Sequence, residues 1–328
     1  MLLYKRSEID LQRAVIFVYA SLMRLEGKLH NQITIIVPVS RMSTKLDNLR
    51  QWLRTVDFES IEVILVHDIQ DVETGRELKE ITFKIPKIQL IEARFGSPGM
   101  ARNAGLDLVK SEWIVFWDSD DLPEVEEVIE MIEIAANGNF AVAVGGFTVQ
   151  SLTSPNLHSL HLIENSISGK LFEEFGMQPG LWRWAFRKEI IGKIRFKAFR
   201  MAEDQCFLFD LNLAGQRIYV HPKSVYTYFV GDEQQLTNNS KALSDLLKSV
   251  PYLMRSIKGS NASKSEFGAL LITRQVLTAL KRGVLSTKIL MIIQVMKFFP
   301  LILFSKGAYF MAALKLLVTK RSPLFHEK

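Results

Sequence analysis

The stretch that decides the fold runs from Gly96 to Asp121 and reads GSPGMARNAGLDLVKSEWIVFWDSDD. A glycine-bracketed helix start leads into an apolar strand, Glu112–Trp117, which is followed by three aspartates within four residues. Because side chains alternate across a strand, Asp118 and Asp120 are expected to start on the same side. Carboxylates this close repel one another unless a cation or fixed hydrogen-bond donors neutralise them. The order therefore predicts a charged ligand site at the end of a strand.

The acidic cluster at 118–121 has two interpretations. Its hard oxygen ligands suit Mg²⁺ or Mn²⁺, with the phosphate oxygens of a nucleotide diphosphate completing the coordination. The alternative is an acidic turn that caps the next helix, since Asp121-Leu122-Pro123 resembles a helix start. The strand before the cluster and the elements around it favour the metal site.

Apolar runs rich in isoleucine and valine alternate with helix-like segments up to this cluster. The runs are Ile33–Val39, Ile61–His67, Lys87–Ala93 and Glu112–Trp117, and the segments between them are Ser43–Val56, Asp71–Ile81 and Pro98–Lys110. The alternation predicts an α/β fold with a mostly parallel sheet and helices on both faces. Such sheets bind ligands at the carboxyl ends of their strands, where three polar stretches fall: Pro38–Arg41, His67-Asp68 and Asp118–Asp121.

The remaining segments extend this pattern. We expect helices at Pro123–Ala136 and Ala202–Leu213, strands at Phe140–Val149, Leu181–Arg187 and Arg217–Phe229, and only helices from Ala242 onward. The chain is therefore predicted to have three parts: an N-terminal helical extension (1–30), an α/β domain (31–240) and a basic, apolar C-terminal helical region (241–328).

Composition limits the class of partner. The chain has 328 residues, is 48% hydrophobic and carries a formal charge of +6. The excess charge lies in the tail, because no acidic residue occurs between Glu266 and Glu327. No groove-reading motif accompanies it, so a nucleic-acid partner is not expected. A single cysteine, Cys206, and the absence of an apparent signal peptide predict a cytoplasmic location.

The helix start after Gly96 predicts a phosphate contact. Gly99 allows the backbone to approach a ligand closely, and the free N–H groups of the first helical turn favour an anion. We expect Arg102 to pair with a diphosphate and Asn103 to fix either the nucleotide or the loop. Gly105 has a purely structural alternative, which is tight packing of the helix on the sheet.

Taken together, these motifs resemble those of the large family 2 of nucleotide-sugar glycosyltransferases, whose GT-A fold is Rossmann-like. The resemblance covers about residues 33–237. It rests on a first strand ending in Pro38, A-R-N-x-G-L at 101–106, D-S-D-D at 118–121, E-D at 203–204, Y-x-Y at 226–228 and L-T at 236–237. Each motif is modest alone, whereas their order and spacing are specific.

The resemblance implies a role for each matching acid. Asp68 would recognise the nucleotide base, Asp118 would contact the ribose or a metal-bound water, and Asp120 would bind the metal. Asp204 would be the catalytic base and Glu203 would orient that base or the acceptor. The sequence departs from the family at His67, where a second aspartate is common, and at Ser40-Arg41 in place of Tyr-Asn. Both departures touch the base pocket.

Three further residues are candidates for the site. Trp182 or Trp184 is expected to stack on a sugar in the acceptor pocket, although an alternating strand buries one of its faces as core. His221 follows the D-x-D at about the family's interval for a third metal ligand. Its alternative is a surface histidine at a strand end.

The tail at Val284–Val318 is very apolar, yet lysines interrupt it every nine residues: Lys288, Lys297, Lys306 and Lys315. No charge-free run approaches the ~20 residues of a transmembrane helix. We expect two short helices, separated at Pro300, that lie in an anionic membrane interface. The alternative is a helical lid packed on the domain or in a dimer.

The sequence thus predicts an inverting, metal-dependent glycosyltransferase that moves a sugar from a nucleotide-diphosphate donor, expected to be a UDP-sugar, to a hydroxyl acceptor. The acceptor is expected to be a glycan or lipid-linked glycan of the bacterial cell envelope, and the location peripheral at the inner face of the plasma membrane. The alternatives are a nucleotidyltransferase and a catalytically inactive nucleotide-sugar-binding module.

Overall fold

The computed structural model describes residues 33–40, 42, 46–154, 156–163, 175, 178–231 and 240–298. Three predictions lie outside these residues: the N-terminal extension at 1–30, the L-T motif at 236–237 and the tail beyond residue 298. Arg41, one of the departures from the family pattern, also lies outside them.

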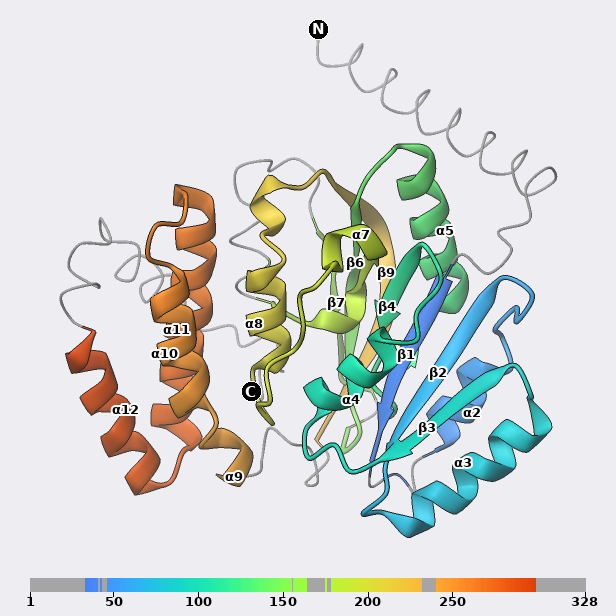
Figure 1. The fold of residues 1–328 in the computed structure, drawn as a ribbon, viewed down its shortest axis with the longest axis horizontal. Helices are drawn as coiled ribbons and strands as arrows, with labels where there is room; N and C mark the ends of the chain where they lie inside the picture. The colour runs from blue at the N-terminus through green and yellow to red at the C-terminus, as the bar shows by residue number, and fades with distance from the viewer. Residues whose placement is uncertain are drawn as a thin grey trace, which may run out of the picture.

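The first half of the sheet is parallel, as predicted. Four neighbouring strands follow the order β3-β2-β1-β4, and each joins its neighbour in parallel register (Figure 1). The strands are β1 (Ile33–Val39), β2 (Ile61–Asp68), β3 (Ile88–Ala93) and β4 (Trp113–Phe116), and the helices between them are α2 (Asp47–Leu53), α3 (Val72–Lys84) and α4 (Pro98–Leu106). All four predicted strands and all three helices are present.

The second half of the sheet is mixed, so the prediction of a mostly parallel sheet holds only for the first half. Strand β8 runs antiparallel to β4 and β6, β9 runs parallel to β6, and β5 and β7 pair antiparallel with β9 and β6. Their bounds are β5 (Leu122–Pro123), β6 (Val142–Ser151), β7 (His158–His161), β8 (Trp184–Arg187) and β9 (Ile218–Val230). The predicted strand at 181–187 begins as a single 3₁₀ turn, η1 (Leu181–Arg183).

Helices cover both faces of the sheet because successive strand residues point to opposite sides. Ile35 of β1 belongs to the apolar cluster that includes side chains of α2, α3 and α5 (Val125–Asn137). Its neighbour Ile36 belongs to the cluster on the other face, under α4 and α8 (Glu203–Asp210). Both side chains are fully buried. Burial on both faces explains why β1 and β2 read as continuous apolar runs.

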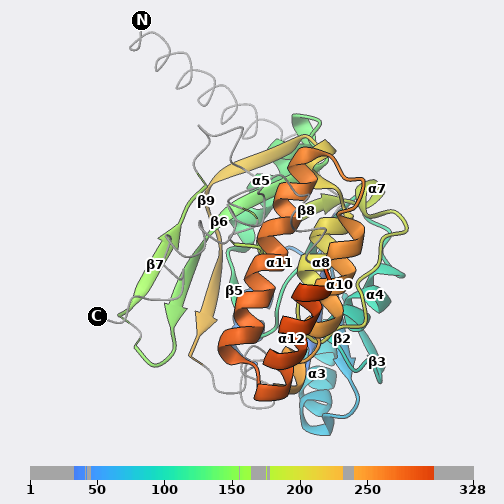
Figure 2. The ribbon, with the colours of Figure 1, turned by 90° about the vertical axis from the view of Figure 1, so that its left-hand side faces the viewer.

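The C-terminal helices extend the second of these clusters. They are α9 (Ser240–Leu243), α10 (Leu246–Ser256), α11 (Ala262–Arg282) and α12 (Leu285–Lys297), and a short helix α7 (Lys188–Ile191) follows β8. Helices α10 and α11 contact α8, and α12 contacts α10 and α11 (Figure 2). None of the helices in the described part of the chain is long and apolar enough to cross a membrane.

An ion pair ties α10 to the loop before α8. Asp245, whose side chain is 2% exposed, accepts hydrogen bonds from the backbone N of Arg200 at 2.9 Å, from its Nε at 2.8 Å, and from Lys248 Nζ at 2.8 Å. Burial alone would raise the pKa of Asp245, but the bonds from Arg200 and Lys248 outweigh it and lower the pKa to about 2.

Replacing Asp245 with Asn is expected to lower the free energy of unfolding by about 1–3 kcal/mol at pH 7, since charged hydrogen bonds are lost. The carboxylate's pKa is depressed on folding, so its contribution is complete above the unfolded value of about 3.9 and is lost as the pH falls through 2. Urea unfolding at pH 7 and pH 3 measures both effects. Asp107→Asn is the control, because its ion pair with Arg195 is exposed. Equal losses in both variants would contradict the expectation.

Candidate active site

The polar ends of three neighbouring strands meet at one edge of the sheet. Strands β1, β2 and β4 are parallel and adjacent, with Val39 beside His67 and Ile36 beside Phe116. Asp68 at the end of β2 and Asp118 after β4 therefore lie at the same edge. Pro38 lies two residues beyond Ile36, the last β1 residue paired with β4, so its missing N–H breaks no bond to that strand.

A buried arginine joins helix α4 and the D-S-D-D motif to α8. Arg102 of α4 is 5% exposed; its Nη2 donates to Asp118 Oδ1 at 2.7 Å and its Nη1 to Glu203 Oε1 at 2.8 Å. Both terminal nitrogens of Arg102 thus bond carboxylates of the protein, which fixes the relative positions of D-S-D-D and E-D. The expected contact of Arg102 with a diphosphate stays a prediction.

Asn103 and Gly99 both contact the loop at Phe196 and Lys197. The Asn103 side chain bonds both backbone groups of Phe196, donating to its O at 2.9 Å and accepting from its N at 2.8 Å. A Cβ on Gly99 would lie 2.9 Å from the Lys197 carbonyl oxygen. Of the two roles expected for Asn103, fixing the loop is therefore the one that is present. Protein atoms occupy the space that a side chain at position 99 would need, and the approach of a ligand to the Gly99 backbone stays a prediction.

Gly105 has the structural role expected as its alternative, which is tight packing of the helix on the sheet. A Cβ at this position would lie 2.6 Å from the Ile36 side chain. Helix α4 therefore packs tightly on β1, which brings Arg102 close to the strand ends.

The acidic pair at the start of α8 has perturbed ionisation. Ala202, just before the pair, has a left-handed backbone with φ 65°, and this turn starts the helix. Burial raises the pKa of Glu203, against the opposing effect of Arg102. Burial and the neighbouring Glu203 raise the pKa of the half-buried Asp204 to about 7. A carboxyl group that titrates near neutrality suits general base catalysis.

Within D-S-D-D the aspartates differ in environment. Asp121 is 1% exposed and accepts from Tyr226 Oη at 3.1 Å and from Phe229 N at 2.9 Å. Burial, with the nearby Asp120 and Asp118, raises its pKa well above the ordinary value. Asp118 and Asp120 are half-buried, so their oxygens remain the accessible ones.

Asp121 is the buried aspartate of D-S-D-D and does not cap the next helix. Helix α5 has Glu124 at its N-cap, with no side-chain capping bond. The acidic cluster at 118–121 therefore does not form the capping turn that was the alternative to a metal site. The accessible carboxylates of Asp118 and Asp120 are hard oxygen donors that fit Mg²⁺ or Mn²⁺.

Tyr226 connects these aspartates, since its Oη accepts from Asp118 N at 3.1 Å while donating to Asp121. Tyr226→Phe removes both bonds and leaves Asp121 with one donor fewer. It is expected to lower the free energy of unfolding by about 1–3 kcal/mol. Thermal and urea unfolding measure this, with Tyr219→Phe as the control because its ring is only half-buried on the same strand. An unchanged stability would contradict the supporting role of Tyr226.

Asp68 closes the turn that leads to α4. Its Oδ2 accepts from Gly96 N at 3.0 Å and Phe95 N at 3.3 Å, and its Oδ1 from Gln70 N at 3.2 Å. His67, the departure from the family pattern, is buried and donates from Nε2 to the Asp71 carbonyl at 2.9 Å. The histidine thus has a structural role, and Asp68 is the acid presented at this strand end.

The two tryptophans have different environments. Trp184 is 1% exposed and stacks on Phe186 within the core, so the expectation that it contacts a sugar is wrong. Trp182 is half-buried; its ring stacks on Tyr226 at 4.5 Å and on Tyr228 at 5.6 Å between centroids. The 3₁₀ turn at 181–183 replaces the expected strand alternation and places Trp182 beside the Y-x-Y strand.

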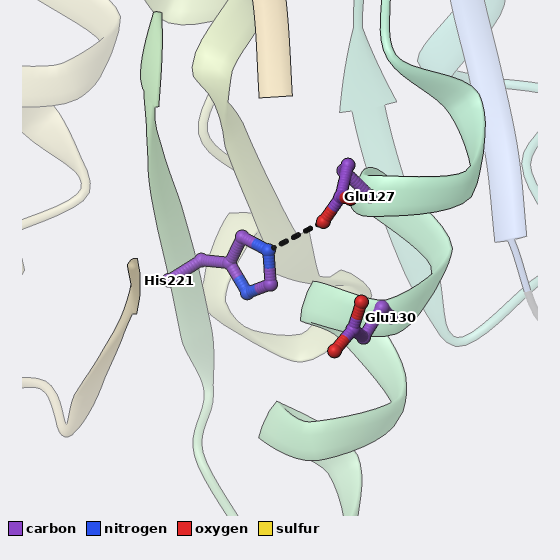
Figure 3. Close-up of side chains that lie close together, drawn as sticks. All are labelled: Glu127, Glu130 and His221. Atoms are coloured by element: carbon purple, nitrogen blue, oxygen red, sulfur yellow. Dashed lines mark hydrogen bonds and ion pairs between the residues drawn. The ribbon is translucent and has the colours of Figure 1, made fainter. Parts of the chain in front are cut away.

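His221 does not join D-S-D-D. Its Nε2 lies 3.1 Å from Glu127 Oε2, and Glu130 lies beside them (Figure 3). Both glutamates belong to α5. Among the described residues this is the group of acids and histidine close enough to share an ion, and it contains no residue of D-S-D-D. Lys223 Nζ already lies 2.9 Å from Glu127 and 3.0 Å from Glu130. The prediction of His221 as a third ligand beside Asp120 is therefore wrong.

Arg274 of α11 is a cation near Asp204 that no motif in the sequence indicates. Gln275 of α11 donates to Gln205 at 2.9 Å, which places its neighbour Arg274 against the start of α8. Burial lowers the pKa of Arg274, and the charge of Asp204 opposes this effect. No local motif marks Arg274, because its position depends on how α11 packs.

The family model for "Glycosyl transferase family 2" matches residues 34–210. The chain belongs to glycosyl transferase family 2. The match includes the A-R-N-x-G-L helix, D-S-D-D and the E-D pair, so it contains Arg102, Asp118 and Glu203. It confirms the resemblance on which the sequence analysis relied.

Curated relatives of the chain include named glycosyltransferases. Poly(ribitol-phosphate) beta-N-acetylglucosaminyltransferase TarP of Staphylococcus aureus is 24% identical over 216 residues, which cover 61% of this chain and 62% of TarP. The aligned regions of three curated relatives cover between 30% and 62% of those proteins. The chain thus spans only part of the length of these relatives.

Solved structures show the same fold. TarS 1-349 of S. aureus in complex with UDP-GlcNAc superposes with a TM-score of 0.60 at 15% identity, covering 90% of this chain and 93% of that one. The mannosyltransferase PcManGT from Pyrobaculum calidifontis, in complex with GDP-Man and Mn²⁺, gives 0.53 at 13% identity, covering 96% and 98%. The α/β fold predicted for family 2, with C-terminal helices, is confirmed.

Proposed function

We propose that this chain is an inverting, metal-dependent glycosyltransferase that moves a sugar from a UDP-sugar to a hydroxyl of a cell-envelope glycan or lipid-linked acceptor. One observation carries the proposal. The carboxyl group of Asp204, with a pKa of about 7, is joined through Glu203 and Arg102 to Asp118 of D-S-D-D. The ion pairs of Arg102 thus hold Asp204 at a fixed separation from the acidic edge that contains Asp118.

Asp204 would act on the acceptor. Its carboxylate takes the proton of the acceptor hydroxyl as that oxygen forms a bond to the anomeric carbon. The bond from the anomeric carbon to the diphosphate oxygen breaks, and its electron pair leaves with the nucleoside diphosphate. Attack from the face opposite the leaving group inverts the carbon, so the base must lie away from the diphosphate. Glu203 keeps the base oriented through its bond to Arg102.

The donor would lie at the edge formed by Asp68, Asp118 and Asp120. Asp118 and Asp120 would hold the divalent metal, which stabilises the negative charge of the departing diphosphate when bound. PcManGT was solved with Mn²⁺, which supports a divalent ion in this fold. Asp68 can accept the imide N–H of uracil, and TarS in complex with UDP-GlcNAc supports a uridine nucleotide.

The acceptor side is proposed at Trp182, a half-buried ring of the aromatic stack on the Y-x-Y strand. An aromatic face binds the apolar face of a sugar ring. The name of TarP supports an acceptor of the cell envelope. A cytoplasmic enzyme acting on such a glycan would work at the inner face of the plasma membrane.

Donor binding can be tested by thermal shift with UDP-, GDP- and CMP-sugars, each with and without MnCl₂. We expect a metal-dependent shift with a UDP-sugar and its loss in Asp120→Asn. A shift only with another nucleotide would overturn the uridine assignment, and a metal-independent shift would overturn the role of Asp120. Membership of family 2 disfavours the nucleotidyltransferase alternative. Donor binding without transfer to any acceptor would support the inactive binding module.

A further inference from the structure

Helix α12 presents an apolar stripe to the outside of the protein. Five side chains at helical spacing are between 49% and 73% exposed: Leu285, Ile289, Ile292, Ile293 and Met296. With about 100° per residue, they fall within an arc of about 100° on the helix. A helix of a soluble protein ordinarily turns such a stripe toward the core, whereas α12 turns its apolar stripe toward the outside.

The opposite side of α12 is the side that packs. Thr287 is 3% exposed and Met291 is fully buried, and they point about 180° and about 140° away from the centre of the stripe. Gln294 donates to the Leu247 carbonyl at 2.8 Å, which anchors that side to α10. Helix α12 is also the outermost of the C-terminal helices (Figure 1). The stripe therefore faces away from the described protein.

Positive charge borders the stripe on both sides. Lys288 lies about 80° from its centre in one direction and Lys297 about 100° in the other. Helix α12 contains no acidic residue, and none occurs in the sequence between Glu266 and Glu327. Lysine stems can extend along an apolar surface while their ammonium groups reach anions at its rim. The surface thus combines an apolar centre with a cationic border.

We infer that the outward stripe of α12, with Lys288 and Lys297, binds an anionic lipid surface and lies in its headgroup region. The charges decide between the possible occupants. A second copy of this helix would bring lysines against lysines, with no acid on either helix to pair with them. The chain that follows α12 adds Lys306 and Lys315 and no acid before Glu327. Anionic headgroups pair with both lysines, and the acyl region takes the stripe.

The inference concerns the location of the proposed enzyme but does not depend on its chemistry. Flotation of the full chain with vesicles of phosphatidylglycerol and phosphatidylcholine, against phosphatidylcholine alone, measures it without any donor. We expect flotation only with the anionic vesicles. Replacement of Leu285, Ile289, Ile293 and Met296 with Gln should abolish flotation, and Lys288→Gln with Lys297→Gln should weaken vesicle binding about tenfold or more.

The matched control is Val72→Gln with Phe83→Gln on α3, whose side chains are 72% and 87% exposed. This variant should float like the unmodified chain. Thermal unfolding checks that each variant remains folded. Equal flotation of the stripe variant and the unmodified chain would overturn the inference. It would also be overturned if the unmodified chain failed to bind anionic vesicles and light scattering showed that it is a dimer, while the stripe variant is a monomer. Loss of the UDP-sugar thermal shift would contradict the proposed function and leave this inference standing.

Discussion

Replacing Asp204 with Asn is expected to lower the rate of sugar transfer by about 10³-fold, the usual contribution of a positioned general base. The amide cannot accept the acceptor proton, while its size and its place at the start of α8 are unchanged. Steady-state kinetics with a UDP-sugar measures kcat directly. The control is Asp210→Asn on the same helix, because the Asp210 carboxylate bonds Tyr252 and lies outside the proposed site. A fully active Asp204→Asn variant would disprove the assignment of the base.

The same residue sets the expected pH dependence. The pKa of Asp204 is raised to about 7, so a growing fraction is protonated as the pH falls below that value. Only the ionised form can take a proton from the acceptor. We therefore expect kcat to rise with pH through about 7 and then level off. The pH profile of the residual activity of Asp204→Asn should lack this step, which distinguishes the base from other titrating groups.

Replacing Arg102 with Gln is expected to have the largest effect on stability. It leaves Glu203, whose side chain is 8% exposed, and the partly exposed Asp118 without their shared cation. Removing one partner of a buried ion pair lowers the free energy of unfolding by about 3–5 kcal/mol. The pKa of Asp204 should also rise, because Arg102 is the charge that opposes its increase. The rise of kcat should then move to a higher pH.

Two measurements separate this positioning role from the diphosphate contact first expected of Arg102. Urea unfolding reports the stability of Arg102→Gln, and the donor-induced thermal shift reports its affinity for a UDP-sugar. Arg195→Gln is the control, since its ion pair with Asp107 is exposed and contributes about 0–1 kcal/mol. Unchanged stability together with loss of the donor-induced shift would restore the diphosphate assignment.

Much of the fold was predictable because its signals are local. The apolar runs of β1, β2 and β4 are buried on both faces, and such runs are visible without any tertiary information. The polar ends at Asp68 and Asp118 share an edge because the strands are parallel neighbours, which the β/α alternation implies. The second half of the sheet was harder to predict from the sequence, since the pairing of β8, β6 and β9 joins segments far apart in the chain.

The errors at the site concern partners rather than residue types. Trp184 and His221 were plausible by type and interval, but strand pairing buries the first in the core and places the second beside Glu127. Arg102 was expected beside a diphosphate, and its partners in the folded chain are the carboxylates of Asp118 and Glu203. Spacing along the chain does not reveal which of several compatible groups will meet.

The sequence alone determined the family 2 fold, the edge of the sheet that carries the acids, and the acidic pairs themselves, because strand periodicity and ordered motifs are properties of short segments. Only the tertiary structure decided that Arg102 bridges Asp118 and Glu203, that Tyr226 supports D-S-D-D, and that α12 turns its apolar stripe outward. Each of these depends on contacts between elements distant in sequence. Burial then sets their energetics, including the raised pKa of Asp204, and burial exists only after the chain has folded.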